Sequence, residues 1–168
     1  MKEIFERTSV RKYTDQKVTD EQIDKLLKAA MAAPSAMNRQ PWEFIVVRDP
    51  EMLEKLGRST PYSTPALRSK CTIVTLADAN SSGSNIYLHD LGAACENILL
   101  EAVHLGLGTV WMAITPSAER EQAVRELLNI PENIVPFSMI AIGYPAGEVK
   151  PKDKFKPEKI HYEKYQAV

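Results

Sequence analysis

The chain has 168 residues, of which 44% are hydrophobic and 26% are charged, and its formal net charge is −1. These values are typical of a single globular domain, and the small net charge argues against a nucleic acid or an anionic membrane as a partner recruited by bulk charge. No apolar run approaches the ~20 residues that a membrane-spanning helix needs. The N-terminal residues show no apolar core of a signal peptide, so we expect a cytoplasmic protein.

Helix and strand signals alternate along the chain. Apolar spacing and capping residues predict helices over residues 2–7, from the Thr19 N-cap to Pro34, from Asp49 to about Gly57, over about 85–105 and after the Ser117 N-cap. Apolar and β-branched runs predict strands over residues 42–48, 71–77, 108–114 and 136–142. The order lacks a regular strand–helix–strand period. It therefore predicts an α+β or mixed α/β fold, with helices on both sides of a four- or five-stranded sheet.

Two segments are expected to lack extensive regular structure. Residues 58–69 contain two prolines, so we expect a loop with no more than a helical turn. Residues 144–168 are rich in lysine and proline, yet they carry the large apolar side chains Phe155, Ile160, Tyr162 and Tyr165. Such a tail is expected to wrap over another surface, for example that of a second subunit.

Near the N-terminus, Arg7 and Arg11 are four residues apart, with Ser9 between them. The planar guanidinium offers paired donors that match a phosphate group, so this segment is a candidate phosphate site if the backbone turns. Two solvated surface arginines are the alternative. The run Lys150–Lys156 could add a cation to the same phosphate, or it could be a solvated segment.

The loop over residues 33–41 concentrates hydroxyl and amide groups on Ser35, Asn38 and Gln40. Amides both donate and accept hydrogen bonds, which suits the edge of a flavin or a pteridine. The alternative is a loop that caps itself through Asx and Ser turns.

Other sequence patterns exclude several kinds of site. The glycines of Gly106-Leu-Gly108 follow a helix and open a strand, which is the reverse of a dinucleotide-binding fingerprint. Cys71 and Cys95 lie in apolar runs without a C-x-x-C motif, so we expect reduced thiols in the core. The histidines lack metal-ligand spacing.

Taken in order, these segments resemble the nitroreductase family of flavoproteins over nearly the whole chain. The resemblance is carried by Arg7-Thr-Ser-Val-Arg-Lys-Tyr13, Ala33-Pro-Ser-Ala-Met-Asn-Arg-Gln-Pro-Trp42, Asp90-Leu-Gly-Ala-Ala-Cys-Glu-Asn97, Leu105-Gly-Leu-Gly-Thr-Val-Trp111, Ile142-Gly-Tyr-Pro145 and the segment Lys152–Tyr162. Two positions depart from the family pattern. Ala113 stands near a position where glycine is frequent, and Lys154 stands where arginine is common.

The resemblance implies one domain over residues 1–168, with a mainly antiparallel sheet, and an intertwined homodimer in which residues 144–168 wrap the partner subunit. It also implies two FMN sites at the subunit interface. The residues implied in each site are Arg7, Thr8, Ser9 and Arg11 with Lys154 around the phosphate, Pro34, Ser35, Ala36 and Asn38 from the partner subunit with Gln40 near the flavin, and Met112 and Ala113 near the flavin N5.

The implied activity is ping-pong hydride transfer from NADH or NADPH to the flavin and then to a nitroaromatic, quinone or flavin acceptor. The resemblance implies no catalytic side chain and no metal, because the chemistry belongs to the cofactor. The brevity of residues 58–69 implies a permissive site without an elaborate lid. A module that binds FMN without turnover, for storage or redox sensing, is the alternative.

Overall fold

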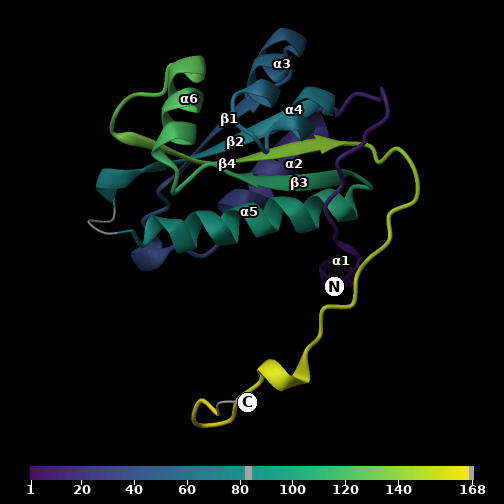
Figure 1. Ribbon diagram of the computed structural model, residues 1–168, viewed down its shortest axis with the longest axis vertical. Coiled ribbons are helices and arrows are strands. Elements are labelled where there is room, and N and C mark those ends of the chain that lie inside the picture. Colours follow the sequence, from purple (N-terminus) through teal and green to yellow (C-terminus); the bar gives the residue numbers. More distant parts are fainter. Residues whose placement is uncertain (82–84, 167–168) are drawn as a thin grey trace.

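The computed structural model describes residues 1–81 and 85–166, and a four-stranded antiparallel sheet forms its centre (Figure 1). The strands are β1 (Trp42–Val47), β2 (Cys71–Asp78), β3 (Gly108–Ala113) and β4 (Ile134–Gly143). Their order in the sheet is β1-β2-β4-β3, so β4 lies between β2 and β3 and the edges are β1 and β3. The expected α+β architecture with a four-stranded sheet is confirmed.

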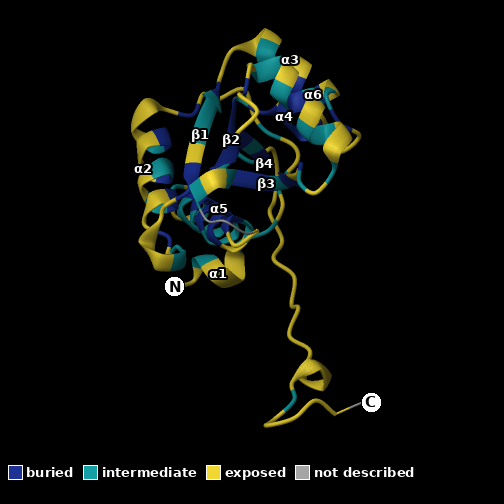
Figure 2. Cartoon of the chain, turned by 90° about the vertical axis from the view of Figure 1, so that its left-hand side faces the viewer, coloured by how far each residue is buried: buried dark blue, intermediate teal, exposed yellow. Residues whose placement is uncertain are grey.

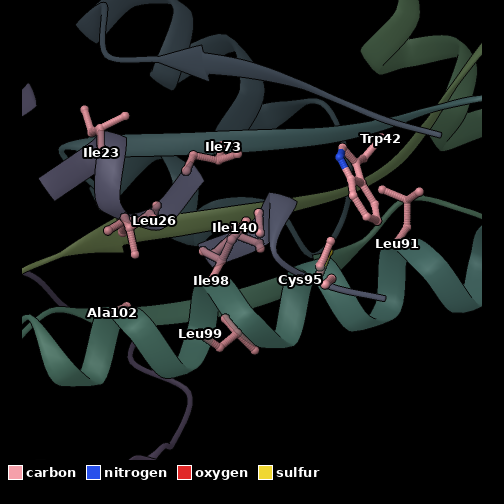
Figure 3. Packing of buried hydrophobic residues seen from close by; sticks show 14 of the residues in the cluster. Ile23, Leu26, Trp42, Ile73, Leu91, Cys95, Ile98, Leu99, Ala102 and Ile140 are labelled. Atoms are coloured by element: carbon pink, nitrogen blue, oxygen red, sulfur yellow. The ribbon is translucent and has the colours of Figure 1, made fainter. Parts of the chain in front are cut away.

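One face of the sheet is covered by α2 (Asp20–Met31) and α5 (Tyr87–His104) (Figure 1). Their buried side chains pack with residues of the strands, as Figure 3 shows for Leu26, Trp42, Ile98 and Ile140. Cys95 is buried in the same cluster, and Cys71 also belongs to it, both as free thiols. The two cysteines are therefore core residues, as their apolar surroundings in the sequence predicted.

The opposite face carries α3 (Pro50–Arg58), α4 (Thr64–Arg68) and α6 (Ala118–Leu128) (Figure 2). Leu56 and Val124 from these helices pack with Val74 and Met139 of the sheet. Burial on both faces explains why β2 and β4 read as nearly continuous apolar runs rather than as alternating patterns.

Local signals set the starts of two helices as expected. The Thr19 hydroxyl accepts the Gln22 N–H at 3.2 Å, and the Thr19 N–H donates to the Gln22 side chain at 3.0 Å, which completes the capping box of α2. The Asp49 carboxylate accepts the Met52 N–H at 2.8 Å and caps α3.

The structure adds detail to three local expectations. α3 ends at Arg58, close to the expected end near Gly57. Gly57 lies inside the helix, however, and a Cβ on it would lie 2.5 Å from the Leu67 Cβ, so this glycine permits the close approach of α3 and α4. Residues 64–68 form the short helix α4, which is the helical turn that the expectation for residues 58–69 allowed. Ser117 occupies the N-cap of α6, but its side chain makes no capping bond, and the Thr115 hydroxyl instead donates to Glu121 at 2.8 Å.

Both ends of the described chain lie outside the layered body. The N-terminus forms α1 (Glu3–Glu6) next to α5. Residues 146–160 and 162–166 are exposed and run away from the body, with one short 3-10 turn over Pro157–Lys159 (Figures 1 and 2). Phe155 and Tyr162 keep 74% and 73% of their surface exposed, which leaves the tail without apolar cover in a single chain. No helix among the described residues is both long and apolar enough to cross a membrane.

Candidate functional site

Residues 7–14 form a strap, here called the N-terminal strap, along the edge of β3. Ser9 forms an isolated bridge with Thr109, and the Val10 N–H donates to the Thr109 carbonyl at 2.8 Å. The close approach depends on Gly108, because a Cβ there would lie 2.7 Å from the Val10 Cβ. The strap therefore has a fixed position, and Arg7, Ser9 and Arg11 lie on it.

Tyr13 fastens the C-terminal part of the N-terminal strap. Its hydroxyl donates to the Val10 carbonyl at 2.6 Å and lies 3.2 Å from the Ala141 carbonyl. Burial raises the pKa of Tyr13 above its ordinary range, so the hydroxyl remains a donor at physiological pH. The Thr14 N–H adds a bond to the Tyr144 carbonyl at 2.8 Å.

The two arginines of the strap face different cavities. Arg7, whose side chain is 18% exposed, lines a cavity of about 420 Å³ together with Lys154 of the tail. Its Nε lies 3.6 Å from a carboxylate oxygen of Glu96. Arg11 is exposed and lines a second cavity of about 320 Å³ with Met112 and Ala113. Within one chain the structure thus groups Arg7 with Lys154, and Arg11 with the end of β3.

The end of β3 presents backbone groups at an open sheet edge. The Ile114 N–H donates to the Phe137 carbonyl of β4, whereas the Thr109 carbonyl, five residues earlier, points to the other side and accepts the Val10 N–H of the strap. Because hydrogen-bonding direction alternates along an antiparallel strand, the N–H and carbonyl of Ala113 point away from β4. The Met112 side chain is buried in the core, so of this pair Ala113 is the residue that can offer its N–H to a ligand.

The loop over residues 33–41 is ordered by its own hydrogen bonds. The Gln40 N–H donates to the Ser35 hydroxyl at 3.0 Å, and the Gln40 amide donates to the Asn38 side chain at 3.1 Å. Met37, Asn38 and Gln40 adopt left-handed backbone angles, with φ of 54°, 55° and 51°. The self-capping predicted as one alternative is present. Pro34, Met37, Asn38 and Gln40 nevertheless remain exposed, which leaves the loop surface open to a ligand or a partner.

Asp90 holds this loop against the body, a role that sequence reasoning did not identify. Its Oδ1 accepts the Ala36 N–H at 2.9 Å, and the residue is only 5% exposed. Its Oδ2 is buried without a hydrogen-bond partner among the described residues. Asp90 lies in the first turn of α5, where the helix dipole favours a carboxylate. An acidic residue on the buried face of a predicted helix is the signal that could have revealed it.

The strap and the loop lie at opposite edges of the sheet. The loop leads directly into β1, whereas the strap runs along β3, and β2 and β4 lie between these two edge strands. With strands about 4.8 Å apart, the edge strands are separated by roughly 14 Å. Within one chain, the loop and the strap therefore do not meet directly.

Comparisons with known proteins give one consistent result. The model of the family described as "Nitroreductase family" matches residues 4–78 and 62–144. A protein of Archaeoglobus fulgidus, provisionally named an NADH dehydrogenase/NAD(P)H nitroreductase, is 47% identical, and the match covers 98% of each chain.

Solved structures agree with the sequence comparison. The FMN-dependent nitroreductase of Clostridium difficile R20291 is 31% identical with a TM-score of 0.91, covering 98% of this chain and 100% of that one. A provisionally named nitroreductase of Desulfovibrio desulfuricans, solved in complex with FMN, is 30% identical with a TM-score of 0.83, covering 98% and 96%. By sequence and by fold, this chain belongs to the nitroreductase family.

Proposed function

We propose that this chain is an FMN-dependent NAD(P)H oxidoreductase whose site is assembled from the N-terminal strap of one subunit and the 33–41 loop of its partner. Family membership and the FMN complex of the Desulfovibrio relative support the cofactor. The observation that carries the proposal is the open end of β3, where the exposed Ala113 directs its N–H outward beside Arg11.

The residues present fit the chemistry of FMN. Arg7 and Lys154 line one cavity and would hold the phosphate dianion, with the strap hydroxyls of Thr8 and Ser9 nearby. The Ala113 N–H would donate to the flavin edge, and the Arg11 guanidinium would stabilise negative charge on the ring. FMN, when bound, supplies hydride acceptance from NADH or NADPH and electron transfer to an oxidant.

The chain's own residues would act by binding and orientation. With a nitroaromatic acceptor the balance of one turnover is NADH + H⁺ + ArNO₂ → NAD⁺ + ArNO + H₂O, and quinones or free flavin are further candidate acceptors. This chemistry needs no side-chain nucleophile, because bond making and breaking take place between the cofactor and its substrates. The alternative, a module that binds FMN without turnover, would use the same protein contacts.

An anaerobic absorption spectrum separates these functions. We expect a yellow protein whose flavin bands bleach on addition of NADH or NADPH and return with an oxidant. Bands that persist with both nucleotides would favour the binding module, and a colourless protein that takes up no added FMN would refute the flavin site.

A complementation experiment tests the shared site. A strap variant, Arg7→Ala/Arg11→Ala, and a loop variant, Asn38→Ala/Gln40→Ala, are co-expressed with different tags, and heterodimers are purified through both tags. Because a two-fold dimer would pair the intact strap of one chain with the intact loop of the other, about one FMN per heterodimer is expected, against almost none in either variant alone. A heterodimer without FMN, or a monomeric wild-type protein, would contradict the shared site.

A further inference from the structure

The short segment between α3 and α4 places one aromatic ring at the Ala113 end of β3. The Thr60 N–H donates to the Ser63 hydroxyl at 3.0 Å, and that hydroxyl donates to the Thr60 carbonyl at 2.8 Å. Ser63 is fully buried, so the turn over residues 60–63 is anchored to the body. Tyr62, within this turn, is 65% exposed. The turn therefore presents the Tyr62 ring in a defined position, although the segment is too short for an elaborate lid.

Arg120 of α6 lies over this ring. The guanidinium carbon is 4.8 Å from the centroid of Tyr62, and Nη1 is 3.3 Å from the Ala113 carbonyl, to which it donates. Stacking and one hydrogen bond fix the plane of the group while most of its five N–H donors stay available. No carboxylate of the described residues lies within salt-bridge distance of Arg120.

The cavity of about 320 Å³ at this position is lined by two guanidiniums and no carboxylate. Arg11 and Arg120 lie on its wall with Tyr62, Trp111 and Ala113. Another cavity, of about 560 Å³, is different, because Asp15 and Asp49 line it together with basic residues. The cavity at the end of β3 therefore carries positive charge that no carboxylate in its lining neutralises.

We propose that Tyr62 and Arg120 form a recognition site for the carboxylate of an aromatic electron acceptor. The acceptor ring would pack near Tyr62, and its carboxylate would receive paired N–H donors from Arg120, the geometry in which arginine binds carboxylates most strongly. This inference rests on the proposed function, since the acceptor must reach a flavin bound beside Ala113. Arg120 and Tyr62 are then the residues that determine acceptor specificity.

The test compares two acceptors of nearly equal size, 4-nitrobenzoate and 4-nitrobenzamide, with full-length, FMN-loaded protein at saturating NADH. Losing a charge-assisted contact of about 1.5–3 kcal/mol corresponds to a roughly 10- to 150-fold fall in the ratio of the two kcat/KM values, carboxylate over amide. We expect this fall in Arg120→Gln, a smaller one in Arg120→Lys, which keeps the charge but loses the planar fork, and an intermediate one in Tyr62→Leu. Arg68→Gln, which removes an exposed charge on α4, should leave the ratio unchanged.

Benzoate provides a second readout that does not depend on turnover. Titrated into the oxidised holoprotein, it should perturb the flavin spectrum of the wild type and bind at least 10-fold more weakly to Arg120→Gln. An unchanged ratio together with unchanged benzoate binding would overturn the inference while leaving a reducible flavoprotein, and hence the proposed function, intact. A change confined to the KM for NADPH relative to NADH would also overturn it, by assigning Arg120 to the donor's phosphate. Loss of both FMN uptake and NAD(P)H oxidation in the wild type would refute the proposed function itself.

Discussion

The Tyr13 hydroxyl donates to the Val10 carbonyl at 2.6 Å, so the N-terminal strap is closed by one of its own side chains. The same hydroxyl lies 3.2 Å from the Ala141 carbonyl of β4, which ties this closure to the centre of the sheet. The position of Arg7 and Arg11 therefore depends on a half-buried tyrosine that does not need to touch a ligand.

Tyr13→Phe should loosen the strap without removing the ring. Two part-buried carbonyls lose their donor, so we expect a loss of about 1–3 kcal/mol in the free energy of unfolding and weaker FMN binding. Urea denaturation and FMN titration measure the two effects. Tyr165→Phe, which removes the hydroxyl of a ring that is 82% exposed, is the control for stability. Equal stability of both variants would show that the Tyr13 hydroxyl does not fasten the strap.

Two glycines should respond oppositely to alanine. A Cβ on Gly108 would meet the Val10 side chain at 2.7–2.8 Å, whereas nothing lies within 4 Å of a Cβ on Gly92 in α5. We expect Gly108→Ala to lower the melting temperature and the FMN affinity, and Gly92→Ala to stabilise the helix by about 0.5–1 kcal/mol. Combining Val10→Gly with Gly108→Ala should cost less than the sum of the two single changes, because Val10→Gly removes the Cβ and both Cγ atoms that the new Cβ would meet. Strictly additive effects would contradict the close contact.

Removal of the Asp90 carboxylate should release the 33–41 loop. Asp90→Ala leaves the Ala36 N–H without its acceptor, which costs about 1–3 kcal/mol, while Asp90→Asn keeps an acceptor oxygen and should cost less. Limited proteolysis should cleave the loop faster in Asp90→Ala than in Asp90→Asn. Cleavage at the wild-type rate in both variants would remove Asp90 from its positioning role.

Arg11→Ala should weaken FMN binding by about 1.5–3 kcal/mol, the typical contribution of a charge-assisted hydrogen bond. Equilibrium dialysis at protein concentrations near the dissociation constant measures the change. The matched control is Arg58→Ala, which removes an arginine paired with Glu54 on α3, on the opposite face of the sheet from α2 and α5. If Arg11→Ala retained stoichiometric FMN through dialysis, Arg11 would be excluded as an FMN-binding residue.

Both thiols should be unreactive in the folded protein. Burial raises the pKa of Cys95 to about 11 and that of Cys71 to about 12, so at pH 8 the nucleophilic thiolate is nearly absent. A thiol whose pKa is higher in the folded than in the unfolded protein contributes stability that is fully present below the unfolded pKa. For Cys95 this contribution is lost as the pH rises from about 9 toward 11. A disulfide-exchange reagent at pH 8 should therefore titrate both thiols only after denaturation. Rapid reaction of either thiol in the native protein would contradict its burial.

Local chemistry made much of the fold predictable. The capping box of Thr19 and Gln22 and the Asp49-Pro50 start are signals confined to a few residues, and the structure confirms both. Long apolar runs gave the four strands because both faces of the sheet are buried. The same local reasoning located the end of α3 but not the role of Gly57, since a glycine required by a neighbouring helix has the same appearance in a sequence as one that ends a helix.

The unpredicted part of the site depends on contacts between distant segments. Asp90 meets Ala36 across 54 positions, and Arg120 meets Tyr62 only because α6 and the turn before α4 pack on the same face of the sheet. The assignments of Arg7, Lys154 and the loop to one FMN site remain predictions.

The position of β4 has a consequence for the order in which the molecule can form during synthesis. β2 and β3 both pair with β4, which follows them in the chain, and the N-terminal strap bonds to Thr109, Ala141 and Tyr144. Pairings between the first and last parts of a chain form late, because a long loop must close before they contribute any stability. A nascent chain therefore cannot complete the bonds of the strap until Ala141 and Tyr144 have emerged, and Arg7 and Arg11 are held in place only after β4 has been made.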